Sequence, residues 1–247
     1  MRLQGRVAIV TGAGRNIGAA IARVFAAEGA AVAVVDIVEA RAQAVADALC
    51  AERPDAAVGI ACDVTSSAAV QVMVESVRSR LGPVDILVNN VGVVDRKNVL
   101  ELAEADWDRV IGITLKSVFL CTKYVGLAMV EAGRGGRIIN IASSSGHRGR
   151  ADATAYPSAK GGVLNLTRSL AIQLAPYRIR VNSITPNRVA TEVGPGEVPR
   201  RWAVTNLIGR QTTPLDIARA AVFLASDDAE AITGIDLLVD GGAAAGM

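Results

Sequence analysis

The sequence predicts an α/β protein of three layers, in which helices cover both faces of a doubly wound parallel sheet of about seven strands. Short β-branched runs alternate with longer Ala-rich helical stretches along all 247 residues. No hairpin signal joins consecutive strands, so each return to the sheet requires a crossover connection. Apolar residues make up 51% of the chain and aromatic residues only 3%. Such small apolar side chains let helices approach a sheet closely.

Each predicted strand is a short apolar run of largely β-branched residues. These runs lie at 7–10, 31–35, 58–61, 86–88, 137–142, 179–184 and 237–239. The predicted helices are 17–28 before Gly29, 39–50, 67–81 before Gly82-Pro83, 107–132 before Gly133, 156–174, and one that begins at Pro214 with Thr213 as its cap. No linker or change in composition divides the chain, so residues 1–247 are expected to form a single domain.

Charge and cysteine content restrict the classes of partner. The formal net charge is +2, with scattered charges, which argues against nucleic-acid binding. Cys50, Cys62 and Cys121 lack metal-ligand spacing and are expected to be buried thiols in a reducing compartment. Residues 1–6 run directly into the first strand, which leaves no room for a signal peptide, and no uninterrupted apolar stretch reaches membrane-spanning length. We expect a soluble, cytoplasmic protein without a metal or a membrane partner.

A glycine-rich turn directly follows the first strand and opens the first helix. In this turn, residues 11–18, backbone N–H groups and the helix N-terminus can approach a pyrophosphate. The spacing departs from G-x-G-x-x-G, because three residues separate Gly14 from Gly18, and glycines also terminate strands. The turn predicts a dinucleotide site whose contacts are Gly12, Arg15, Asn16, Ile17 and Gly18.

Asp36, at the end of the second strand, bears on the choice of coenzyme. In a Rossmann-like sheet a carboxylate there accepts hydrogen bonds from the adenosine ribose and repels a 2′-phosphate. The alternative is that Asp36 caps the following helix. Arg15 favours the opposite coenzyme, because its guanidinium can pair with a 2′-phosphate. We expect NAD, with NADP as the alternative.

Tyr156 and Lys160 lie four residues apart and therefore on one helical face. A Tyr ordinarily loses its proton near pH ~10. A nearby Lys cation and a nicotinamide ring both favour the phenolate and lower that pKa. Tyr156 can then donate a proton to a ketone or remove one from an alcohol. The motif alone arises by chance in many helices.

Several further segments occur in a fixed order around this motif. They are 11–18, Asp36, 62–64, 89–92, 141–144, 156–160, 186–191 and 239–242. Together they resemble the short-chain dehydrogenase/reductase family over essentially the whole chain, and within it members like the 3-oxoacyl-ACP reductases. The resemblance implies a Rossmann-like fold and hydride transfer between a nicotinamide and a carbonyl or secondary alcohol.

The resemblance also implies a role for each matched residue. Ser143 would hydrogen-bond the substrate oxygen, and Tyr156 would exchange the proton. Lys160 would tune Tyr156 and hold the nicotinamide ribose, and both residues would contact the cofactor. The remaining expected cofactor contacts are Asp63 and Val64 at the adenine, Asn90 and Gly92 along the groove, and Pro186, Val189 and Thr191 at the nicotinamide end.

Three residues depart from the family's pattern. Thr114 replaces an Asn that completes a catalytic tetrad, which predicts a slower proton relay. The alternative is a catalytically impaired protein that binds dinucleotide as a sensor or scaffold. Asn16 and Asn187 replace small residues, and we expect them to fit because Asn tolerates left-handed backbone geometry.

The sequence leaves the substrate open between simple carbonyls or alcohols and acyl thioesters. Arginines can attract an anionic substrate or can simply be solvated surface residues. They are Arg148, Arg150, Arg188, Arg200 and Arg201. Residues between Thr191 and Gly209 would form a lid, and His147 is expected to be exposed. The resemblance further implies a homotetramer, with the helices around Thr114 and Ala171 forming one interface.

Overall fold

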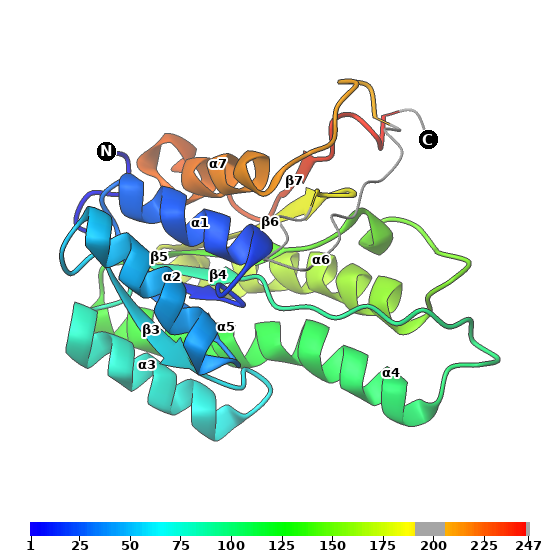
Figure 1. Cartoon of the computed structure of the whole chain (residues 1–247), viewed down its shortest axis with the longest axis horizontal. Helices are drawn as coiled ribbons and strands as arrows, with labels where there is room; N and C mark the ends of the chain where they lie inside the picture. Colours follow the sequence, from blue (N-terminus) through cyan, green and yellow to red (C-terminus); the bar gives the residue numbers. More distant parts are fainter. Residues whose placement is uncertain (191–205, 246–247) are drawn as a thin grey trace.

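The computed structural model describes residues 1–190 and 206–245, and within them seven parallel strands form one sheet. Their order is β3-β2-β1-β4-β5-β6-β7 (Figure 1). The strands are β1 (Val7–Thr11), β2 (Ala31–Asp36), β3 (Ala57–Ala61), β4 (Ile86–Asn89), β5 (Gly136–Ile141), β6 (Ile179–Pro186) and β7 (Asp236–Val239). The predicted sheet is confirmed. Its strand order reverses between β1 and β4, which opens a crevice at the carboxyl ends of these strands.

Helices cover both faces of this sheet, which completes the three predicted layers. They are α1 (Asn16–Ala27), α2 (Glu39–Glu52), α3 (Ser67–Leu81), α4 (Glu104–Ile111), α5 (Ser117–Ala132), α6 (Ala155–Leu174) and α7 (Pro214–Ala225). Ala8 and Val10 of β1 face the core shared with α1, α2 and α7. Val7 and Ile9 face the core shared with α3, α5 and α6. Figure 1 shows α7 and α1 above the sheet and α3 and α5 below it.

Most predicted boundaries lie within about two residues of the observed ones, a normal spread for helix and strand ends. The predicted cap of α7 is confirmed. The Thr213 hydroxyl accepts a hydrogen bond from the Asp216 N–H, and the Asp216 carboxylate accepts one from the Thr213 N–H. Pro214 occupies the first turn, where its missing N–H is not needed.

The long helix expected at 107–132 differs from the prediction in two ways. It begins three residues earlier, at Glu104, where Glu104 and Asp106 place negative charge in the first turn. It also contains a π-helical turn, Gly112–Lys116, between α4 and α5. Apolar periodicity does not reveal such a turn, because inserting one residue into a helix changes the local hydrogen bonding without breaking the apolar face.

The stretch Glu104–Ala132 also qualifies the expectation about membranes. It is 29 residues long, and its most apolar window has a mean hydropathy of 1.5, so length and composition alone would allow it to span a membrane. Half of that window is buried inside the fold. Leu120, Cys121 and Val125 of α5 pack in the core beneath the sheet. The stretch is therefore a core helix of the folded protein.

Candidate active site

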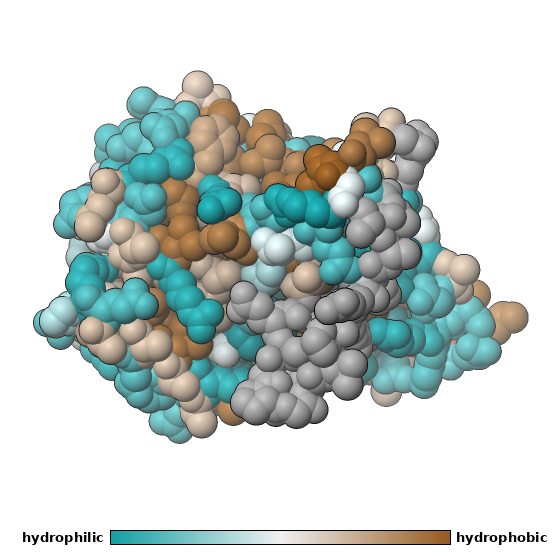
Figure 2. Space-filling model, turned by 45° about the horizontal axis from the view of Figure 1, so that its top comes forward, coloured by the Kyte–Doolittle hydropathy of each residue, from teal (hydrophilic) through white to brown (hydrophobic). Residues whose placement is uncertain are grey.

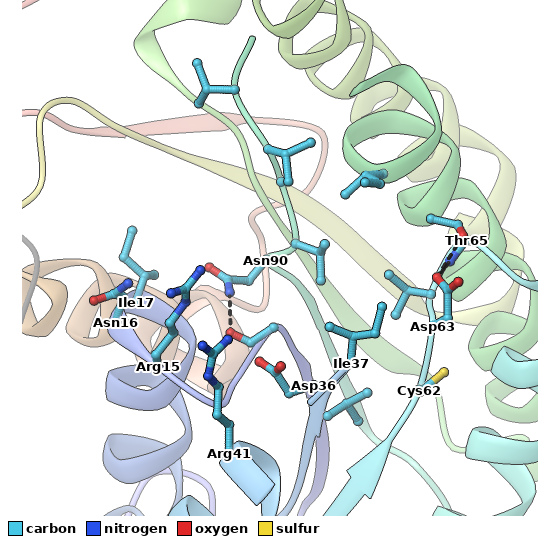
Figure 3. A pocket seen from close by; sticks show the side chains of 18 of the residues that line it. Arg15, Asn16, Ile17, Asp36, Ile37, Arg41, Cys62, Asp63, Thr65 and Asn90 are labelled. Atoms are coloured by element: carbon cyan, nitrogen blue, oxygen red, sulfur yellow. Dashed lines mark hydrogen bonds between the residues drawn. The ribbon is translucent and has the colours of Figure 1, made fainter. Parts of the chain in front are cut away.

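A groove of about 620 Å³ lies at the carboxyl edge of the sheet, where the crevice was expected (Figure 3). Its walls come from the glycine-rich turn, from the segments after β2, β3 and β4, and from residues before the undescribed segment 191–205. The predicted cofactor contacts that line it are Gly12, Arg15, Asn16, Ile17, Asp36, Asp63, Val64, Asn90, Gly92 and Val189. Gly18, Pro186, Tyr156 and Lys160 do not line it, and Thr191 lies outside the described residues.

The glycine-rich turn is packed so tightly that two of its glycines leave no room for a side chain. A Cβ at Gly18 would lie 2.3 Å from the Gly12 carbonyl oxygen, so this glycine allows α1 to pack against the turn. A Cβ at Gly14 would lie 2.6 Å from the Arg41 Cβ and 2.8 Å from Asp36 Oδ2. The close packing keeps backbone N–H groups at the groove, which is what a pyrophosphate requires.

Asn16 adopts the left-handed geometry expected of it, with φ of 51°. Its Oδ1 is buried and has no hydrogen-bond partner. A buried amide that lacks a partner is costly unless a ligand or water completes it. Asn16 also lines the groove, so this amide fits a bound dinucleotide.

Asp36 holds the glycine-rich turn in place. It is 8% exposed, and its two carboxylate oxygens accept hydrogen bonds from Gly14 N at 3.1 Å and Val38 N at 3.0 Å. The N-cap of α2 is Val38, so the alternative that Asp36 caps this helix is wrong. The carboxylate instead joins the end of β2 to the turn, at the position where an adenosine ribose would bind.

Arg41 is a groove residue that the sequence analysis missed. It lies in the first turns of α2, and Figure 3 shows its side chain, with that of Arg15, on the same side of the groove as Asp36. Its spacing of five residues from Asp36 carries no recognised motif. The ribose end of the groove therefore combines one carboxylate with two guanidinium groups.

The predicted adenine end has a polar rim and apolar walls. Asp63 Oδ1 accepts hydrogen bonds from Thr65 N at 2.9 Å and Thr65 Oγ1 at 2.7 Å, which fixes its side chain (Figure 3). Val64 and Ile37 also line the groove. Burial raises the pKa of the Cys62 thiol to about 11, with a further contribution from the charge of Asp63, so the thiol stays protonated at neutral pH.

The structure brings Ser143 and Tyr156 together, although they lie on different elements. Ser143 follows β5, and its hydroxyl accepts a hydrogen bond from Ser145 N at 3.2 Å and lies close enough to the Tyr156 phenol to influence its pKa. Burial raises the pKa of Tyr156, and the nearby Ser143 hydroxyl and the charge of Arg150 oppose this rise. The protein's own groups therefore do not give the lowered Tyr156 pKa expected from the sequence.

Lys160 lies one turn after Tyr156 on α6 and is 3% exposed. Its Nζ donates a hydrogen bond to the Ile141 carbonyl at 2.5 Å and lies 5.9 Å from the centre of the Tyr156 ring. Burial lowers the pKa of Lys160 to about 8. A Cβ at Gly92 would lie 3.4 Å from Lys160 Nζ, so the ammonium reaches the segment that lines the groove.

Thr114 lies in the π-helical turn and is completely buried. Its Oγ1 accepts a hydrogen bond from Val93 N at 3.1 Å and donates one to Val93 O at 3.3 Å. The hydroxyl is therefore engaged with the backbone of the groove wall. The group at this position that remains for a proton relay is the backbone carbonyl of Thr114, which is present whatever the side chain.

Asn187 also differs from the expectations, whereas His147 does not. Asn187 does not adopt left-handed geometry, whereas the next residue, Arg188, has φ of 44°. Asn187 Oδ1 instead accepts a hydrogen bond from Ser144 Oγ at 2.9 Å. His147 is exposed, as expected, and its Nε2 lies 2.7 Å from Asp236 Oδ2.

The arginines expected near the substrate are only partly described. Arg150 forms a bidentate ion pair with Asp152, at 2.9 and 2.8 Å. Arg200 and Arg201 lie outside the described residues, as does most of the expected lid. Within residues 1–190 and 206–245, no three His, Cys, Asp or Glu side chains cluster as a metal site would require.

These features define a class of protein. A parallel sheet with a phosphate-binding turn, an acidic residue after β2, and a Ser–Tyr pair beside a buried Lys are the parts of a dinucleotide-dependent oxidoreductase. A family model described as enoyl-(acyl carrier protein) reductase matches residues 12–244. The chain belongs to the short-chain dehydrogenase/reductase family, whose members use a nicotinamide dinucleotide and act on secondary alcohols or carbonyls.

Full-length relatives agree with this assignment. The D-threitol dehydrogenase of Mycolicibacterium smegmatis is 44% identical over 245 residues, covering 98% of this chain and 94% of the relative. The galactitol 2-dehydrogenase of Agrobacterium fabrum is 39% identical, with 98% of both chains covered. A solved short-chain dehydrogenase/reductase from Burkholderia xenovorans has a TM-score of 0.91 and 40% identity, covering 99% of this chain and 98% of that one.

Proposed function

We propose that this protein is an NAD(H)-linked dehydrogenase that oxidises a secondary hydroxyl of a small polyol and reduces the corresponding ketone. The proximity of the Ser143 and Tyr156 hydroxyls, beside the buried Lys160, is the observation that carries the proposal. Relatives named for D-threitol, galactitol and meso-2,3-butanediol, each 38–44% identical to this chain, support a small polyol or diol substrate.

The protein's own groups have distinct roles in this reaction. A nicotinamide bound in the groove supplies the hydride acceptor or donor. The Ser143 and Tyr156 hydroxyls together hold the substrate oxygen, and two donors stabilise an alkoxide better than one. Tyr156 exchanges the proton with that oxygen. Lys160 keeps a cation near the phenol and reaches the groove wall at Gly92, where a nicotinamide ribose would be held.

The proposal is tested by replacing Tyr156 with Phe and following nicotinamide absorbance. We expect turnover of D-threitol, galactitol or meso-2,3-butanediol to fall about 100-fold or more, the usual contribution of a general acid or base. NADH binding should change little, because Tyr156 does not line the groove. Tyr177→Phe is the matched control, since this half-exposed Tyr lies beyond the opposite end of α6.

The outcomes separate the competing functions. Turnover that survives Tyr156→Phe would show that the proposed chemistry is wrong. If acyl thioesters are reduced faster than ketones in the same assay, the substrate is an acyl thioester and not a small polyol. Tight dinucleotide binding without turnover of any alcohol, ketone or thioester in the panel would favour a sensor or scaffold.

NAD is proposed as the coenzyme because the Asp36 carboxylate is buried and fixed by two N–H donors, so its charge stays where a 2′-phosphate would lie. Arg15 and Arg41 are the groups that would favour NADP. Fluorescence titration should give a lower Kd for NADH than for NADPH. Asp36→Asn should reduce this preference by about tenfold or more, equivalent to about 1.4 kcal/mol of charge repulsion. Tighter binding of NADPH by the unchanged protein would refute the assignment.

A homotetramer and a cytoplasmic location complete the proposal. The outer faces of α5 and α6 expose Phe119, Leu127 and Ile172, whereas Thr114 and Ala171 are buried within the fold. Figure 2 shows apolar side chains gathered along the upper part of the molecule. Leu215 of α7 is exposed, as are Leu207 and Ile208 before this helix. Light scattering should report four times the monomer mass. The three thiols are free, which suits a reducing compartment.

A further inference from the structure

Asp95 caps the helix that carries Tyr156, although 59 residues separate it from that helix's first N–H donor. It lies in the segment between β4 and α4 and is 5% exposed. Asp95 Oδ2 accepts hydrogen bonds from Thr154 N at 2.7 Å and Ala155 N at 3.0 Å, and Oδ1 accepts one from Tyr156 N at 2.8 Å. N–H groups in a first helical turn have no partner inside the helix. Thr154, the residue at the N-cap, makes no side-chain cap of its own.

The carboxylate of Asp95 is held as a charged group. Burial raises its pKa, but the three backbone donors outweigh burial and keep the pKa below its ordinary value. A negative charge at a helix N-terminus is also favourable. The cap is therefore ionised at neutral pH and binds all three donors at once.

The segment that bears Asp95 also forms one wall of the groove. We call residues 90–95 the strap. Asn90 Nδ2 donates to the carbonyls of Thr11 at 3.0 Å and Gly12 at 3.1 Å, which fixes one end of the strap to the glycine-rich turn. Residues 90–94 line the groove, and Thr114 holds the middle of the strap through Val93. Asp95 fixes the other end to α6.

The strap thus connects the dinucleotide groove to the first turn of α6 through only six residues, which span at most about 20 Å. Tyr156 N–H is itself one of the three capped donors, so a shift of Asp95 acts directly on the residue that carries the phenol. A misplacement of about 1 Å between reacting groups can cost about 100-fold in rate.

The geometry points to Asp95 as a positioning residue, which sets the Tyr156 phenol against the dinucleotide groove by joining the strap to the catalytic helix. This role rests on the proposed function. It differs from that of an ordinary helix cap, whose loss lowers stability but leaves the turnover of folded protein unchanged.

The test compares Asp95→Asn and Asp95→Glu with Asp85→Asn in the full chain. Asn offers one acceptor oxygen instead of two, and Glu keeps the charge but moves it by one methylene. Asp85 is a matched control, because it is 1% exposed, accepts a hydrogen bond from Val7 N at 2.9 Å, and lies at the amino end of β4, away from the groove. Turnover is measured below the unfolding transition of each variant.

Both Asp95 variants should lower kcat about tenfold or more while the Kd for NADH stays within about threefold of the original, since none of the strap's contacts with the glycine-rich turn is removed. Asp85→Asn should lower stability and leave kcat unchanged. Asp95→Glu retains a capping carboxylate and should fold even if Asp95→Asn does not. A normal kcat for Asp95→Glu would overturn the positioning role.

The two proposals fail in different ways. If Tyr156→Phe is inactive but the Asp95 variants keep the kcat of Asp85→Asn, only the positioning role is wrong. If Tyr156→Phe retains full turnover, the proposed chemistry and the positioning role are both refuted.

Discussion

Lys160 should make the stability of this protein rise with pH in the alkaline range. Its pKa falls from an ordinary 10.5 to about 8 because the ammonium is buried. At about 1.4 kcal/mol per pH unit, this corresponds to a cost of roughly 3 kcal/mol for holding the charge inside the fold. Below pH 8 the folded protein bears that cost in full. Between about pH 8 and 10.5 the folded state releases its proton before the unfolded state does, so the cost disappears.

Lys160→Met removes the charge and keeps a side chain of similar length. At pH 7 the variant gains roughly 3 kcal/mol from the removed charge. It loses about 1–3 kcal/mol, because the Ile141 carbonyl no longer receives its hydrogen bond. The free energy of unfolding at pH 7 should therefore be equal to or slightly above that of the original protein. Its activity should be lost.

The pH dependence is the sharper measurement. Urea unfolding of both proteins without dinucleotide should show the original gaining about 3 kcal/mol relative to Lys160→Met between pH 7 and 10.5. Lys123→Met, at an exposed lysine on α5, should show no such change. A difference between the original and Lys160→Met that stays constant within about 0.5 kcal/mol would refute the burial argument.

Two further changes test the groove. Gly14→Ala should raise the Kd for NADH about tenfold or more, because its Cβ would lie 2.6 Å from Arg41 Cβ and force the turn to move. Gly126→Ala, whose Cβ would meet nothing within 4 Å, is the control, and equal Kd values for both variants would contradict the packing argument. Thr114→Val should lower the free energy of unfolding by about 1–3 kcal/mol, because it leaves Val93 N and O without their partner. Thr114→Ser retains both hydrogen bonds, so a similar loss in Ser and Val would show that these bonds are not the cause.

The sequence predicts the sheet well because each strand is a local pattern. The runs at 7–10 and 31–35 are β-branched and apolar on both faces, as a buried parallel strand requires. The cap at Thr213 was also readable, since its partner Asp216 lies only three residues away. The π-helical turn at Gly112–Lys116 was missed, because it changes hydrogen bonding inside a helix whose apolar pattern continues unbroken.

The same difference between local patterns and distant contacts separates the site residues that could be predicted from those that could not. Gly12 and Asp36 could be predicted as groove residues because they belong to one turn and to the strand beside it. Asp95 was missed because its three partners begin 59 residues later, and no spacing in the sequence connects an acidic loop residue to a distant helix. The role of Asp36 as a helix cap was wrong for a related reason. Its second oxygen is bound by Gly14 from another element, which only the packed structure shows.

The way Asp36 is bound links coenzyme choice to the order of the turn. The same carboxylate that would discriminate between the two dinucleotides also joins β2 to the turn through Gly14 N and Val38 N. A substitution that removes the charge of Asp36 and so favours NADP would also remove a hydrogen bond that holds the glycine-rich turn in place. Arg15 and Arg41 already line the groove and can bind the 2′-phosphate of NADP. A change of coenzyme would therefore require a new way to hold the turn rigid, and not a new cation.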